Sequence, residues 1–181
     1  MIKIIGITGV ARSGKDTLFN AISEINKNLK FKRIALADEL KSECDEFLIK
    51  NIGISAFTEE TKEKEIIRPF LVTYGTHIRR KLNENCWIEK AEHTMLNSKD
   101  VDCFVITDVR FLNEMEWIKS KGGKVLHISR DGILPANKEE SENDPHLRDN
   151  ADVRLKVSTF TNDYQNKVRE TILRNHDLQL S

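Results

Sequence analysis

Glycine, lysine and hydroxyl-bearing residues follow one another at fixed spacing near the start of the chain, in the segment G-V-A-R-S-G-K-D-T at residues 9–17. The spacing matches G-x-x-x-x-G-K-[ST], except that an aspartate precedes the threonine. The glycines let the backbone turn and approach a ligand closely, and the lysine and inward-pointing amides favour a polyanion. The segment therefore predicts a loop that binds the phosphates of a nucleotide, with the candidate residues Gly9, Ala11, Arg12, Ser13, Gly14, Lys15, Asp16 and Thr17.

The flanking sequence predicts the strand and the helix that such a loop requires. Apolar residues at 4–7 favour a buried strand, and Leu18, Ile22 and Ile25 share one face of a helix that begins near Lys15. The hydroxyl that usually holds Mg²⁺ is missing at position 16. Asp16 or Thr17 is therefore the candidate metal ligand, because magnesium accepts oxygen ligands.

A second strongly apolar segment, residues 101–108, ends in an acidic residue. In a protein with a phosphate loop, an aspartate at the carboxyl end of a buried strand helps to hold Mg²⁺, so Asp108 is a further candidate ligand. The alternative is that Asp108 only caps the next helix. Arg110 follows two residues later and Glu114 lies in the first turn of that helix, which makes both candidates for substrate binding.

Two polar residues follow a short strand expected at residues 31–36. Asp38, a candidate helix cap, and Lys41 lie in the first turn of a helix expected to run to about residue 50. Ligands of α/β proteins bind at the carboxyl ends of strands, so both residues are candidates for binding a substrate. The alternative is a capped helix on the surface.

Arginines surround a glycine in a helical pattern that begins at residue 66. Arg68 and Arg79 lie on either side of Gly75, where we expect the helix to be interrupted. Arginine binds phosphate through planar, bidentate contacts, although a solubilising role is the alternative. Trp87 begins the next helix and either stacks on a base or belongs to the core.

Residues 130–150 form the most polar stretch of the chain and exceed an ordinary connection in length. We expect a long loop that acts as a lid, with a purely solvated loop as the alternative. Arg130 at its base and Arg148 near its far end would close over the phosphates. Closure of this kind excludes water and neutralises charge on the transferring group.

Length and composition indicate one compact domain, since the chain has 181 residues and a formal net charge of zero. Charges of mixed sign give no case for binding nucleic acid or a membrane. The three cysteines fit no metal pattern and are expected to be reduced thiols. With no signal peptide and no apolar run of membrane-spanning length, a cytoplasmic location is expected. Strands alternate with helices, which predicts an α/β fold with a parallel sheet.

Four segments together resemble the bacteriophage deoxynucleoside monophosphate kinases: residues 9–17, A-D-E-L-K at 37–41, R-P-F-L-V-T-Y-G-T-H-I-R at 68–79 and D-V-R-F-L-N-E at 108–114. The phosphomevalonate kinases are similar as well, because they share the G-K-D loop. The resemblance implies a P-loop NTPase fold, a three-layer α/β/α sandwich in one domain over residues 1–181. A five-stranded parallel sheet, a helical monophosphate-binding segment (37–97) and a lid (130–150) belong to it. It also implies a host-cytoplasm location if the chain is phage-encoded.

The activity implied by this resemblance is transfer of the γ-phosphate of ATP, with Mg²⁺, to a deoxynucleoside 5′-monophosphate. Lys15, Asp108 and Arg130 would carry catalysis. The resemblance places Asp38, Lys41, Arg68 and Arg79 in the acceptor region and Arg130 in the lid. The alternatives are a kinase of another small phosphorylated metabolite, similar to phosphomevalonate, and a nucleotide-dependent switch without an acceptor. The expected partners are small-molecule nucleotides, and the sequence leaves open whether a homodimer forms.

Overall fold

The computed structural model describes residues 3–158 and 164–174. They divide into two compact units. The sheet unit comprises the described residues of 1–34 and 98–181, and the helical unit comprises residues 35–97. No helix among the described residues is long and apolar enough to cross a membrane.

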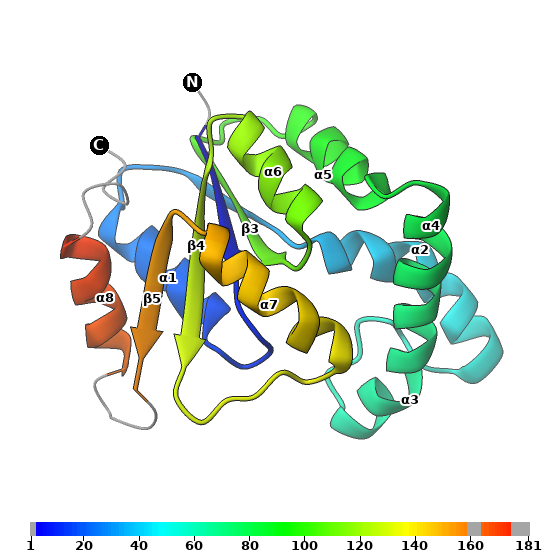
Figure 1. Ribbon diagram of the computed structural model, residues 1–181. Coiled ribbons are helices and arrows are strands. Elements are labelled where there is room, and N and C mark those ends of the chain that lie inside the picture. The colour runs from blue at the N-terminus through cyan, green and yellow to red at the C-terminus, as the bar shows by residue number, and fades with distance from the viewer. Residues whose placement is uncertain (1–2, 159–163, 175–181) are drawn as a thin grey trace. The chain divides into compact units, whose positions relative to one another are not determined.

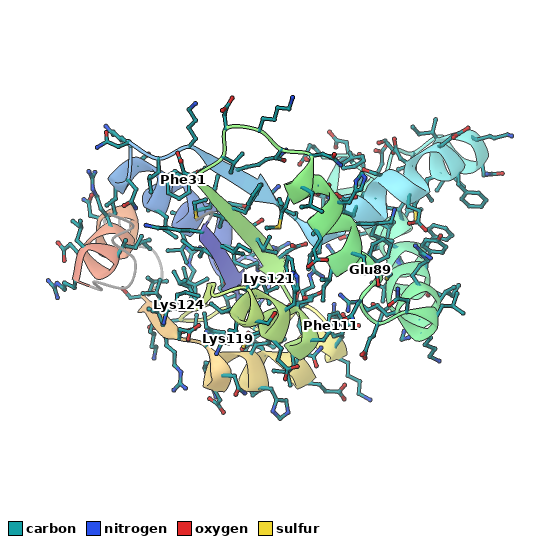
Figure 2. The ribbon with its side chains drawn as sticks, turned by 90° about the horizontal axis from the view of Figure 1, so that it is seen from above. Phe31, Glu89, Phe111, Lys119, Lys121 and Lys124 are labelled. Atoms are coloured by element: carbon teal, nitrogen blue, oxygen red, sulfur yellow. The ribbon has the colours of Figure 1, made fainter. Side chains whose placement is uncertain are left out.

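The sheet unit is built on five parallel strands in the order β2-β3-β1-β4-β5, which confirms the predicted α/β fold. The strands are β1 (Lys3–Thr8), β2 (Phe31–Ile34), β3 (Cys103–Val109), β4 (Lys124–Arg130) and β5 (Val153–Val157). Figure 2 views the sheet from the amino ends of its strands, where Phe31 begins β2 and Lys124 begins β4. The loop after central strand β1 therefore opens at the opposite, carboxyl end of the sheet, where α/β folds bind ligands.

Helices cover both faces of this sheet (Figure 1). On one face lie α1 (Lys15–Ile25) and α8 (Tyr164–Arg174), which pack on buried residues such as Ile5 and Ile7 of β1. On the other lie α6 (Leu112–Ser120) and α7 (Lys138–Asn150). Gly6 of β1 faces α6, because a Cβ there would lie 2.7 Å from Cδ1 of Ile118. The sequence predicts a final helix over residues 160–173, and the first of these residues lie outside the described part of the chain.

Helix α7 corrects the prediction of a long lid loop over residues 130–150. The helix begins where the Asn137 side chain accepts a hydrogen bond of 2.8 Å from the Glu140 amide. Its residues are almost all polar, and Leu147 is its buried residue. Apolar periodicity, the main sign of a helix in a sequence, is therefore absent, and Pro145 in the interior obscured the pattern further.

The helical unit contains α2 (Leu36–Ile52), α3 (Thr61–Val72), a π-helical segment η1 (Thr73–Arg79), α4 (Arg80–Leu82) and α5 (Cys86–Leu96). The expected interruption at Gly75 is wrong, because the chain stays helical from α3 through α4. Gly75 is instead buried against α2, where a Cβ would lie 2.7 Å from Cδ2 of Leu40. The glycine permits close packing of the two segments.

Several finer predictions also need correction. Helix α2 begins at Leu36, so Asp38 lies inside the first turn and is not the cap. Helical spacing in the sequence predicts that Phe47, Leu96 and Leu112 are buried, but all three are exposed. Phe47 stacks on Phe70, with ring centroids 5.5 Å apart. The three cysteines are free and buried, in agreement with the expectation of reduced thiols.

Candidate phosphate-binding site

The loop between β1 and α1 has the backbone conformation of an anion-binding turn. Gly9, Arg12 and Gly14 have φ values of 138°, 65° and 107°, a region that glycine reaches without strain and other residues rarely adopt. Left-handed residues between right-handed ones turn successive amides toward one side and create a concavity for an anion. Helix α1 begins at Lys15, directly after the loop, and adds the positive end of its dipole.

Lys15 is held against this loop. Its Nζ donates hydrogen bonds of 2.8 Å to the carbonyl oxygens of Gly9 and Val10. Burial, above all, and the nearby Arg110 guanidinium lower the pKa of Lys15, and the carboxylates of Glu140, Asp108 and Asp16 oppose that effect. Because the Lys15 ammonium group is already partly desolvated, binding phosphate oxygens in place of the two carbonyl oxygens costs little further desolvation.

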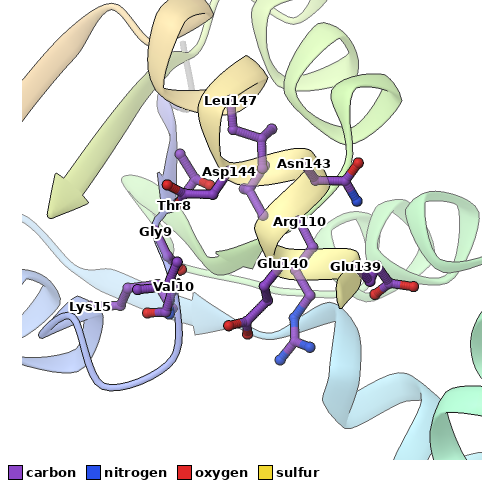
Figure 3. A pocket seen from close by; sticks show the side chains of 11 residues that line it. Thr8, Gly9, Val10, Lys15, Arg110, Glu139, Glu140, Asn143, Asp144 and Leu147 are labelled. Carbon is purple, nitrogen blue, oxygen red and sulfur yellow. Dashed lines mark hydrogen bonds between the residues drawn. The ribbon is translucent and has the colours of Figure 1, made fainter. Parts of the chain in front are cut away.

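A pocket beside the loop is lined by residues from the carboxyl ends of β1 and β3 and from α7 (Figure 3). Its wall includes Thr8, Gly9, Lys15, Arg110, Glu140 and Asp144. The hydroxyl of Thr8 is fully buried and has no hydrogen-bond partner among the described residues. A buried polar atom of this kind fits a pocket that receives a polar ligand.

Glu140 places a carboxylate on the phosphate loop itself. Its Oε2 accepts hydrogen bonds from the amide of Ala11 at 3.2 Å and from that of Ala136 at 2.9 Å. Helix α7 is anchored on the sheet by Asp144, whose Oδ1 lies 3.0 Å from Nε2 of buried His127. Glu140 thus occupies a loop amide that a phosphate oxygen would use. Sequence analysis missed this residue, although the N-x-x-E spacing of Asn137 and Glu140 is typical of a helix start.

Replacing Glu140 by glutamine is expected to strengthen ATP binding about tenfold, because a negative charge no longer competes with the phosphates for Ala11 and Lys15. Isothermal titration with ATP in the absence of any acceptor measures the effect. Glu139→Gln is the matched control, since Glu139 lines the same pocket, whereas the loop amide of Ala11 donates its hydrogen bond to Glu140. Equal or weaker ATP affinity in Glu140→Gln would show that the carboxylate does not compete.

The predicted metal ligands differ in their surroundings. Asp108 is 8% exposed and lies in β3, one residue before the strand ends at Val109. The side chain of Asp16 is 82% exposed and lies 3.7 Å from Nε of Arg33, whereas Thr17 is half-buried in the first turn of α1. No group of three acidic, histidine or cysteine side chains among the described residues could hold a metal ion. Mg²⁺ on a nucleotide needs only one or two protein oxygens beside phosphates and water, so Asp108, Asp16 and Thr17 stay candidate ligands.

The other predicted residues of the sheet unit fall into two groups. Arg110 lines the pocket, and Arg130 ends β4, the strand that pairs with β1. Glu114, a candidate for substrate binding, is 1% exposed and accepts hydrogen bonds from the amides of Arg110 and Phe111 at 2.7 and 3.0 Å. It therefore stabilises the start of α6. Arg148 lies in the last turn of α7 beside Asp149 and is not part of the pocket wall.

The predicted acceptor residues belong to the helical unit. Nζ of Lys41 lies 3.6 Å from Oδ1 of Asp38 on α2, and Arg68 is exposed on α3. Trp87 is 3% exposed, with the Arg79 guanidinium 5.6 Å from its ring centroid, which favours the interpretation of Trp87 as a core residue. Arg79 also contacts Glu43, a residue that the sequence analysis did not single out.

The chain is similar to known kinases, which agrees with the interpretation of residues 9–17 as a phosphate-binding loop. A family model described as phosphomevalonate kinase matches residues 7–124. A protein of Acanthamoeba polyphaga mimivirus is 34% identical over 158 residues, covering 77% of this chain and 80% of the viral protein. It carries the provisional name deoxynucleotide monophosphate kinase.

Two solved structures show the fold alone. Dephospho-CoA kinase from Campylobacter jejuni has a TM-score of 0.50 and 18% identity, over 96% of this chain and 97% of that one. TT1252 from Thermus thermophilus has a TM-score of 0.50 and 14% identity over the same shares. The kinase relatives imply that the chain is a phosphotransferase that uses ATP. With a model match over more than half its length, the chain belongs to the family that the phosphomevalonate kinase model describes.

Proposed function

We propose that this kinase transfers the γ-phosphate of ATP to a deoxynucleoside 5′-monophosphate and releases a deoxynucleoside diphosphate and ADP. The observation that carries the proposal is the left-handed phosphate loop with Lys15 at its end, in a chain 34% identical to a relative named for this activity. The acceptor is itself an oxyanion, so the reaction needs alignment and charge stabilisation more than a strong base.

The sheet unit supplies the donor side of this reaction. The loop amides and Lys15 bind the ATP phosphates, and Arg110 and Arg130 stabilise negative charge at the carboxyl ends of β3 and β4. Asp108 and Thr17, or Asp16 after leaving Arg33, would hold Mg²⁺, which neutralises charge on the phosphates when bound. Arg148 is the weakest candidate, because it lies outside the pocket wall.

The helical unit supplies the acceptor side. Arg79 and Arg68 carry the charge that a monophosphate requires, and Asp38 and Lys41 add polar groups at the start of α2. Arginine suits this task because its planar fork can bind two phosphate oxygens at once.

A panel of acceptors tests the proposal. ADP release is measured with ATP, Mg²⁺ and each deoxynucleoside or ribonucleoside monophosphate, and in parallel with phosphomevalonate. At least one deoxynucleoside monophosphate is expected to give a kcat/KM about 10²-fold above that of phosphomevalonate, because a site built to hydrogen-bond one acceptor strongly rejects another. A panel in which no deoxynucleoside monophosphate increases ADP release would reject the proposal.

Phosphorylation of phosphomevalonate or a similar metabolite is the second candidate, because the matching family model bears that description. The same panel distinguishes it, since turnover would then follow phosphomevalonate and ignore nucleotides. The kinase relatives favour either enzyme over a nucleotide-dependent switch without an acceptor.

A further inference from the structure

One carboxylate in the helical unit connects three of its elements. Glu43 of α2 accepts a hydrogen bond of 2.5 Å from the Tyr74 hydroxyl of η1. Its carboxylate also lies 2.8 Å from Nε of Arg79, in the same segment, and 3.1 Å from Nζ of Lys90 on α5. These side chains lie 31 residues or more from Glu43 in the sequence, so their meeting is a product of the fold.

The charges within the cluster do not balance. Burial alone would raise the pKa of Glu43, but hydrogen bonds from Tyr74 and Lys90 and the charges of Lys90 and Arg79 outweigh it, so the pKa lies below its ordinary value. The same contact raises the pKa of Tyr74 to about 12, which keeps its hydroxyl protonated. One carboxylate thus faces two cations. The excess positive charge favours a further anion, and the Arg79 and Lys90 side chains remain 30% and 37% exposed to receive it.

Two neighbours, Glu43 and Trp87, restrict the orientation of the Arg79 guanidinium. Glu43 contacts its Nε at 2.8 Å and its Nη2 at 3.3 Å, and its Cζ lies over the Trp87 ring, 5.6 Å from the ring centroid. A guanidinium held in this way has lost much of its rotational freedom before a ligand arrives. Binding a phosphate then costs less entropy, because the fork is already oriented.

We propose that Glu43 is a positioning residue for acceptor binding: it holds Arg79 so that the other edge of the guanidinium receives the acceptor's phosphate. Tyr74 and Lys90 in turn keep the Glu43 carboxylate in place. The inference rests on the proposed function, because it concerns the phosphorylated acceptor and not ATP. A phosphomonoester is the ligand class that the cluster selects, since it is an anion whose oxygens fit the geometry of the arginine fork.

Steady-state kinetics of Glu43→Gln test the proposal. Glutamine keeps the shape of the side chain but removes the charge that orients Arg79. We expect the KM for the best acceptor to rise about tenfold, while kcat and the KM for ATP change less than about twofold. Glu46→Gln, an exposed residue of the same helix, carries the same charge change and should alter none of the three. If Glu43→Gln does not fold, Tyr74→Phe should raise the same KM by about threefold.

The double variant separates positioning from a structural role. In an Arg79→Ala background, Glu43→Gln should have no further effect on the acceptor KM, because the group that it positions is gone. An undiminished effect in that background, an unchanged acceptor KM in Glu43→Gln, or equal losses in the ATP and acceptor parameters would each overturn the proposal. If the wild-type enzyme phosphorylates phosphomevalonate but no nucleotide, only the proposed function fails. If it uses no phosphomonoester, both fail.

Discussion

Lys15→Met is expected to lower kcat by about 10²–10³, the loss that follows removal of one preorganised charge donor in a water-poor site. Lys15 is half-buried, and burial with the Arg110 charge lowers its pKa. A cation under these conditions interacts strongly with the γ-phosphate as charge spreads over its oxygens. The expected loss falls mainly on kcat, because that charge is greater in the transition state than in bound ATP.

The measurement is ADP release at saturating ATP and acceptor. Lys27→Met is the matched control, since this lysine is exposed in the same unit and lies beyond the carboxyl end of α1, whose amino end follows the loop. Because Nζ of Lys15 also binds two loop carbonyls, thermal melting must show that the variant keeps its fold. Turnover within a few-fold of the wild type would mean that the loop does not hold the donor phosphates.

The sheet was predictable because local sequence determines it. Apolar, β-branched runs mark β1 and β3 as buried parallel strands, and the phosphate loop carries its own spacing of glycines. The conformation of the loop followed from the types of Gly9 and Gly14, both of which have φ in the left-handed region. For such elements, the residue types that the structure requires are themselves visible in the sequence as an apolar run or a glycine spacing.

The contacts that tune the site could not be predicted, because they join residues far apart in the chain. Glu140 meets Ala11 across 129 positions, and Arg79 meets Glu43 across 36. A polar residue in a polar stretch gives no indication of its partner. Glu114 is the opposite case. Its place in the sequence makes it a candidate for substrate binding, but its carboxylate accepts hydrogen bonds from two main-chain amides and has a structural role.

Gly9→Ala is expected to lower kcat/KM by about 10²-fold or more while the sheet remains folded. Two costs act at this position. A φ of 138° is strained for any residue with a Cβ. That Cβ would also lie 2.2 Å from the carbonyl oxygen of Ile128, which is main chain of β4 and cannot rotate away. The loop must therefore shift away from β4, and its amides lose their alignment toward the phosphates.

Gly122→Ala separates these two costs, because Gly122 has a φ of 75° and, its chain neighbours aside, no heavy atom of the described residues lies within 4 Å of the site where its Cβ would be. It should lose about 1 kcal/mol of unfolding free energy to backbone strain and keep full activity. Gly9→Ala should lose ATP affinity in titration as well as kcat/KM, since a displaced loop binds the ground state poorly too. If both variants had the same activity, the close contact between the loop and β4 would be irrelevant to catalysis. The activity would then depend on Lys15 alone, and the conformation of residues 9–14 would matter only for stability.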